Sequence, residues 1–166
     1  MRPNHTAIDN ERFPIIKIGS TGEAVRKAQH ALYCRRYLVD LSEVDGVFGP
    51  ITRNRVIRYQ LDRSVGEFFA FSFPLAVDGI VGPMTWSRLT PPVIKKGSKG
   101  NPVFLVQEIL KSWAYPDYDP GPVDGDFGKL TETAVKNVQS ILTDCDNVPL
   151  AVDGIVGQKT WEALYA

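Results

Sequence analysis

The chain has 166 residues, 43% of them hydrophobic and 23% charged, which suits one medium domain or two small ones and excludes a disordered chain. Lysine plus arginine equals aspartate plus glutamate, 19 against 19, so no basic field favours nucleic acid or anionic lipid as a partner. The apolar runs fall short of the roughly 20 residues that a membrane-spanning helix needs. The N-terminus lacks the features of a secretory signal, so the localisation stays open between an exported and an internal protein.

The whole chain is an internal duplication. PLAVDGIVG occurs at residues 74–82 and again, letter for letter, at 149–157. Upstream of these copies, glycines, a glutamine, a leucine and a tyrosine recur at one constant spacing along the chain. Two consecutive prolines near the middle discourage a continuing helix. The sequence therefore predicts a tail over 1–14 and two units over 15–92 and 93–166.

In chain order, the first predicted helix of unit 1 begins near Ser20, because Ser20 and Glu23 have the spacing of a capping box. Its counterpart in unit 2 begins near Asn101, with Pro102 in the first turn. Apolar residues follow on one side of both segments at spacings of three to four residues. Each unit is thus predicted to open with an amphipathic helix.

The pattern DGxxGxxT follows each of these helices and recurs later in each unit, starting at Asp45, Asp78, Asp124 and Asp153. Asp followed by Gly suits a tight turn, because the carboxylate accepts a nearby amide and glycine tolerates positive φ. The second glycine then lies beside a helix start. We therefore interpret the aspartates as caps of turns and helix starts, in preference to catalytic carboxylates.

Two further helices per unit complete the predicted fold. The second is expected over 50–63 and 129–142, and the third is a short helix that holds Trp86 or Trp161. We expect these tryptophans to pack in the cores, although aromatic rings also stack on sugars. Because no segment favours a central strand, the prediction is an all-α protein of two tandem three-helix bundles.

Three segments of unit 1, GSTGEAVRKAQHAL, VDGVFGPITRNRVIRYQ and LAVDGIVGPMTWSRL, resemble the peptidoglycan-binding domain family, a three-helix module attached to many bacterial and phage cell-wall hydrolases. Unit 2 resembles the same family, and together the two resemblances cover residues 17–166. The aromatic residue usual before the second glutamine is Tyr59 in unit 1 but Val138 in unit 2. The resemblance implies recognition of bacterial peptidoglycan without chemistry on it.

An enzymatic or metal-dependent function finds little support in the residues. The two histidines are His5, in the tail, and His30, which lies four residues before Cys34 and can share a helix face with it. Two ligands do not make a metal site, so we expect no metal, no cofactor and no enzyme. Cys34 and Cys145 are not at matching positions, which leaves either one bridge between the halves or two separate thiols.

The loop between the first and second helices is the predicted ligand site, because it varies between units while the frame stays fixed. The candidate ligand-binding residues are Tyr33, Arg36 and Tyr37 in unit 1 and Trp113, Tyr115 and Tyr118 in unit 2. Aromatic faces suit sugars or peptide stems, and Arg36 suits a carboxylate. The alternative is that Tyr37 and Tyr115, which are equivalent, are half-buried framework.

Two differences between the units keep a second function class open. Residues 15–92 carry 10 Lys plus Arg and 7 Asp plus Glu, whereas residues 93–166 carry 7 and 10. Unit 1 also has an apolar insertion with Phe69, Phe71 and Phe73, which either closes the interface between units or contacts another protein. The first candidate function is binding to the bacterial cell wall, with avidity from the two tandem units. The alternative is an adaptor or structural subunit of a phage-like or other large assembly.

Overall fold

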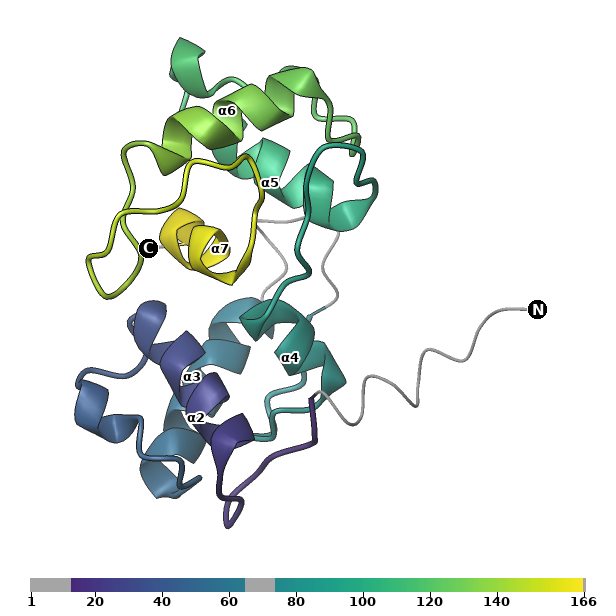
Figure 1. Ribbon diagram of the computed structural model, residues 1–166. Coiled ribbons are helices and arrows are strands. Elements are labelled where there is room, and N and C mark those ends of the chain that lie inside the picture. The colour runs from purple at the N-terminus through teal and green to yellow at the C-terminus, as the bar shows by residue number, and fades with distance from the viewer. Residues whose placement is uncertain (1–12, 65–73, 166) are drawn as a thin grey trace. The chain divides into compact units, whose positions relative to one another are not determined.

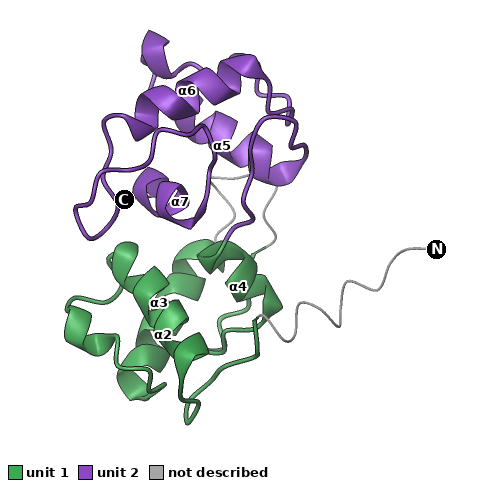
Figure 2. Ribbon diagram, viewed as in Figure 1, with its two compact units in different colours: residues 1–90 green, residues 91–166 purple. Residues whose placement is uncertain are grey.

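The computed structural model describes residues 13–64 and 74–165, and within these ranges it contains helices and isolated β-bridges but no strand. The all-α prediction is therefore confirmed. The chain divides into two compact units, residues 1–90 and 91–166 (Figure 2). Of the predicted features, His5 and the Phe69, Phe71 and Phe73 insertion lie outside the described residues. Across the described ranges, every helix is too short or too polar to cross a bilayer.

Unit 1 contains three α-helices, α2 (Glu23–Cys34), α3 (Pro50–Ser64) and α4 (Pro83–Leu89), among its described residues (Figure 1). A short 3-10 helix, η1 (Leu41–Glu43), lies in the connection between α2 and α3. A proline occupies the first position of both α3 and α4, where its missing N–H has no intrahelical partner to lose. Both helices therefore start where the DGxxGxxT pattern predicts.

Unit 2 repeats this order with α5 (Asn101–Ser112), η2 (Pro116–Tyr118), α6 (Lys129–Gln139) and α7 (Gln158–Tyr165) (Figure 1). Helix α6 ends earlier than its predicted end at 142. After α6 the chain reverses direction. The Leu150 amide donates to the Leu142 carbonyl at 3.2 Å, and Thr143 and Pro149 form an antiparallel bridge.

The predicted capping box at the start of α2 is wrong. The helix begins at Glu23, and its N-cap is Gly22, with no side-chain cap bond. The Ser20 hydroxyl instead accepts the Lys17 amide at 3.1 Å and closes the turn that precedes the helix. In unit 2 the equivalent serine accepts the amide three residues before it in the same way, at 3.0 Å. This serine is thus a turn residue in both units.

The two C-terminal tryptophans are core residues, as the sequence predicts. Trp86 is 2% exposed and its Nε1 donates to the Pro14 carbonyl at 2.9 Å. Trp161 is fully buried and its Nε1 donates to the Pro92 carbonyl at 3.0 Å. Each indole therefore joins the last helix of its unit to the segment that enters the unit. Neither ring is available to stack on a ligand.

Candidate functional site

A buried glutamine holds the first DGxxGxxT turn of unit 1. Gln29 lies on α2, and its Nε2 donates to Asp45 Oδ1 at 2.9 Å and to the Val47 carbonyl at 3.1 Å. The same nitrogen lies 3.0 Å from Thr52 Oγ1, in the first turn of α3. Gln29 Oε1 accepts the Gly46 amide at 2.8 Å. One side chain thus satisfies polar groups of the turn and of the next helix, which would otherwise need water.

The same arrangement recurs at the other three turns, with contacts between 2.8 and 3.2 Å. The groups are Gln60 with Asp78, Gly79, Ile80 and Thr85; Gln107 with Asp124, Gly125, Asp126 and Thr131; and Gln139 with Asp153, Gly154, Ile155 and Thr160. All four glutamines are at most 2% exposed. We call each group a glutamine frame. Each frame ties a helix to the turn that starts the following helix.

The aspartates of the frames cap turns. Asp45 Oδ1 accepts the Val47 amide at 2.8 Å in addition to the amide of Gln29. These two hydrogen bonds lower the pKa of Asp45, with the Val47 amide as the larger cause. The first glycine of the turn, Gly46, has φ 79°, which explains why the pattern requires glycine there. The carboxylates are thus structural, as predicted.

The starts of α4 and α6, by contrast, are not capped by these aspartates. The N-cap residues of α4 and α6 are Gly82 and Gly128, and neither helix has a side-chain cap bond. The predicted capping is therefore wrong for α4 and α6, because the second glycine separates the aspartate from the helix. The frame threonines, such as Thr52, lie in the first turn of the following helix, and their hydroxyl groups contact the frame glutamine.

In unit 1, the predicted ligand residue Tyr37 is held by internal contacts. Its hydroxyl donates to Asp62 Oδ2 at 2.9 Å, and its ring meets the Tyr59 ring edge-on with centroids 5.2 Å apart. Burial, followed by the hydrogen bond to Asp62, raises the pKa of Tyr37 to about 12. Tyr59 is itself 1% exposed. The Tyr37 ring is thus fixed against the core of unit 1.

Arg36, in contrast, is exposed at the C-terminal end of α2. It has a left-handed backbone, with φ 62°. Its amide donates to the Tyr33 carbonyl at 2.8 Å, and the Tyr37 amide donates to the Leu32 carbonyl at 2.9 Å, which together form a Schellman motif. Tyr33 is half-buried and packs against the core. Of the three predicted residues of unit 1, Arg36 is exposed and the two tyrosines are half-buried.

In unit 2, the three predicted residues come together into one aromatic cluster, Trp113, Tyr115 and Tyr118. The Tyr118 ring lies 5.9 Å from Trp113 and 5.8 Å from Tyr115, in edge-to-face arrangements in both cases. Tyr115 is 64% exposed. The loop is anchored from α6, because Asn137 Nδ2 donates to the Asp117 carbonyl at 2.7 Å. The cluster therefore presents an exposed ring on a loop of fixed conformation.

An ion pair closes the same loop. Lys111 Nζ, at the end of α5, lies 2.7 Å from Asp119 Oδ1 and 3.3 Å from the Gly121 carbonyl. Asp119 Oδ1 also accepts the Gly121 amide at 2.9 Å. These contacts lower the pKa of Asp119, with Lys111 as the largest cause. Lys111 and Asp119, two charged groups of this loop, are thus paired with one another.

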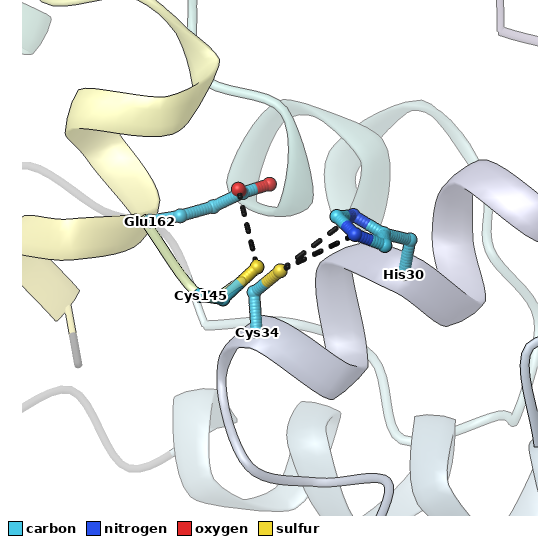
Figure 3. A group of neighbouring side chains, drawn as sticks. All are labelled: His30, Cys34, Cys145 and Glu162. Atoms are coloured by element: carbon cyan, nitrogen blue, oxygen red, sulfur yellow. Dashed lines mark hydrogen bonds between the residues drawn. The ribbon is translucent and has the colours of Figure 1, made fainter. Parts of the chain in front are cut away.

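The two cysteines have polar neighbours within their own units. In unit 1, Cys34 Sγ lies 3.6 Å from His30 Nδ1 on the same face of α2, as the spacing of four residues predicts (Figure 3). In unit 2, Cys145 Sγ lies 3.9 Å from Glu162 Oε2 (Figure 3). Glu162 lies on α7 and is 4% exposed.

The model of the "Putative peptidoglycan binding domain" family matches residues 21–65 and 99–164. The chain belongs to this family. The matched ranges contain the first helix of each unit, the loop after it and the first glutamine frame of each unit. The resemblance inferred from the sequence is confirmed.

Among solved structures, the chain is similar to an endolysin of the Burkholderia AP3 phage, with 20% sequence identity and a TM-score of 0.37. The match covers 76% of this chain and 39% of the endolysin chain, so the chain matches well under half of that protein. No curated protein matches the chain.

The role of the glutamines in this peptidoglycan-binding domain family member is the main feature that sequence reasoning missed. Their recurrence at equal spacings marked them as equivalent, but a glutamine on a helix is ordinarily a surface residue. The sequence feature that could have identified them is the number of residues between each glutamine and the turn that follows it. Each frame glutamine precedes its DG pair by 14 to 18 residues, the length of one helical end and one loop.

Proposed function

We propose that the chain binds bacterial peptidoglycan through its two units and does not cleave it. Membership of the peptidoglycan-binding domain family supports the ligand. The observation that carries the proposal is the aromatic cluster Trp113, Tyr115 and Tyr118, which exposes a ring on an anchored loop. Exposed aromatic side chains on a rigid loop are typical of ligand-binding surfaces.

The absence of cleavage is supported by the state of the repeated carboxylates. A catalytic acid needs a raised pKa, and a base must reach a proton of the substrate. Asp45 and Asp124 instead have lowered pKa values, because each accepts a backbone amide of its turn and the amide of its frame glutamine. These carboxylates are thus committed to the frames that hold the fold.

Unit 1 contributes to binding through Arg36 in this proposal. Its guanidinium is exposed, and a guanidinium can bind a carboxylate through two parallel hydrogen bonds. The stem peptides of peptidoglycan carry carboxylates. Arg36 therefore suits the peptide part of the polymer, and the aromatic cluster suits its apolar surfaces.

Co-sedimentation with purified, protein-free peptidoglycan sacculi tests this function, with chitin and cellulose as control polymers. We expect retention on sacculi in excess of both controls, and no release of soluble muropeptides by the pure protein. Equal retention on all three polymers, or none on sacculi, would contradict specific wall binding. Soluble muropeptides would contradict the absence of cleavage while leaving binding in place.

A further inference from the structure

We infer that the sugar-binding surface lies in unit 2 alone and that it contacts the glycan strand in preference to the stem peptide. The inference rests on the proposed function and assigns a different role to each of the two units. It follows from three pairs of equivalent positions at which the units differ. In each pair, a side chain of unit 1 makes a contact that fixes Tyr37 or ties α2 to α4, and the corresponding residue of unit 2 does not make that contact.

The first two pairs concern the equivalent tyrosines, Tyr37 and Tyr115. Tyr37 is fixed by the Asp62 carboxylate and by the Tyr59 ring. At the sequence spacing that relates Gln60 to Gln139, the positions that correspond to these two partners are Ile141, just beyond the end of α6, and Val138. Isoleucine accepts no hydrogen bond and valine offers no ring edge, so neither can hold Tyr115 as Tyr37 is held. Tyr115 is accordingly 64% exposed.

The third pair is Arg35 and Trp113. Arg35 is buried, and its guanidinium donates to the carbonyls of Ala31 at 3.0 Å and Leu89 at 2.9 Å, which ties α2 to the end of α4. In unit 2 the equivalent position is Trp113, whose ring contacts Tyr118 instead. A position that ties helices together in unit 1 therefore supplies an aromatic surface in unit 2.

The charges around the aromatic cluster favour the glycan over the peptide. Lys111 is the cation that pairs with Asp119 at 2.7 Å, and Asp117 adds a second carboxylate to the same loop. Stem peptides are rich in carboxylates, and their recognition needs a cation that is not already paired. Sugar rings are uncharged and present C–H faces, which pack well on aromatic rings. The cluster is thus suited to an N-acetylated sugar.

Tryptophan fluorescence of the full chain gives a direct test, because Trp86 and Trp161 are 2% and 0% exposed and Trp113 is half-buried. The probes are glycan strands freed of stem peptides by an amidase, and the released stem peptides. We expect the glycan strands, and not the peptides, to change the fluorescence. A response to the stem peptides alone would overturn the assignment to the glycan.

A matched pair of variants, Tyr115→Ala and Tyr37→Ala, tests the division between units. We expect Tyr115→Ala to weaken binding of glycan strands at least tenfold with little change in melting temperature. Tyr37→Ala should change binding less than twofold but lower the melting temperature, because its ring packs against Tyr59. Equal losses of binding would overturn this inference and leave the proposed function standing. Failure of the wild-type chain to bind sacculi would instead contradict the proposed function.

A second substitution introduces into unit 2 the restraint found in unit 1. Ile141 is 57% exposed, so Ile141→Asp should fold and place a carboxylate at the sequence position that corresponds to Asp62, the residue that holds Tyr37 in unit 1. We expect it to reduce binding of glycan strands several-fold by restraining Tyr115, whereas the control Ile141→Leu retains full binding. Unchanged binding in Ile141→Asp would contradict the explanation of why Tyr115 is exposed.

Discussion

Arg36 and Ala114 occupy equivalent positions after the first helix of their units and share a left-handed backbone, with φ 62° and 56°. Most helices that end this way have glycine there, because in other residues the Cβ atom comes close to the backbone, which costs free energy. The amide of Ala114 donates to the Lys111 carbonyl at 3.1 Å, as that of Arg36 donates to Tyr33. Both loops thus begin with a strained residue next to the candidate site.

Glycine at either position should relieve this strain. We expect Ala114→Gly and Arg36→Gly each to raise the free energy of unfolding by about 0.5–1 kcal/mol, measured by urea denaturation. Ala114→Gly serves as the control, because it removes a single methyl group. Only Arg36→Gly should weaken retention on sacculi. Full retention by Arg36→Gly would show that Arg36 does not contact the ligand.

The phenol of Tyr37 should make the stability of the chain sensitive to alkaline pH. Its pKa is raised to about 12 in the folded chain, whereas an unfolded tyrosine titrates near about 10. Between these values the unfolded state loses its proton while the folded state keeps it, so the free energy of unfolding falls as the pH rises. Below about pH 10 the contribution is fully present.

Denaturation curves of the wild type and Tyr37→Phe across this pH window measure the effect. The wild type should lose more stability than the variant, because phenylalanine keeps the ring but has no proton to lose. Parallel losses in the two proteins would show that the raised pKa of Tyr37 does not contribute to the loss of stability.

At the scale of the elements, the helices of each unit are joined in series by the glutamine frames. Gln29 on α2 holds the turn that starts α3, and Gln60 on α3 holds the turn that starts α4. In unit 2, Gln107 on α5 and Gln139 on α6 hold the starts of α6 and α7. The second and third helices of each unit therefore depend on the preceding helix for the conformation of their entry turns.

Removal of a frame glutamine should cost more than removal of its aspartate. Gln60→Leu leaves the Gly79 amide and the Ile80 carbonyl without their partner in the core, and should lower the free energy of unfolding by about 3–5 kcal/mol. Asp78→Ala removes an exposed turn cap and should cost about 1 kcal/mol.

Melting temperature and retention on sacculi, measured on the same preparations, check both variants. Asp78→Ala should bind fully when folded, because the frame holds the structure and does not contact the ligand in our proposal. A variant with an unchanged melting temperature and no binding would show instead that the turn itself is the ligand site.

At the scale of the whole molecule, the repeat in the sequence predicts the all-helical class and the burial of Trp86 and Trp161, because these depend on local periodicity. The start of α2 was missed, because its serine closes a turn that looks like a capping box in sequence. The different exposure of Tyr37 and Tyr115 depends on residues of another helix, Asp62 and Tyr59 in unit 1. The residues of the loop alone therefore do not predict this difference in exposure.

The serial frames also bear on how the chain reaches its fold. Their glutamine-to-aspartate bonds join residues only 14 to 18 positions apart, so each bond closes a short loop at small entropic cost. A helix and the turn after it supply every contact of a frame except the contact with the threonine of the next helix. During synthesis, the hydrogen bonds between a frame glutamine and its turn can therefore form as soon as the turn has emerged, before the C-terminal tryptophan that completes the core has been made.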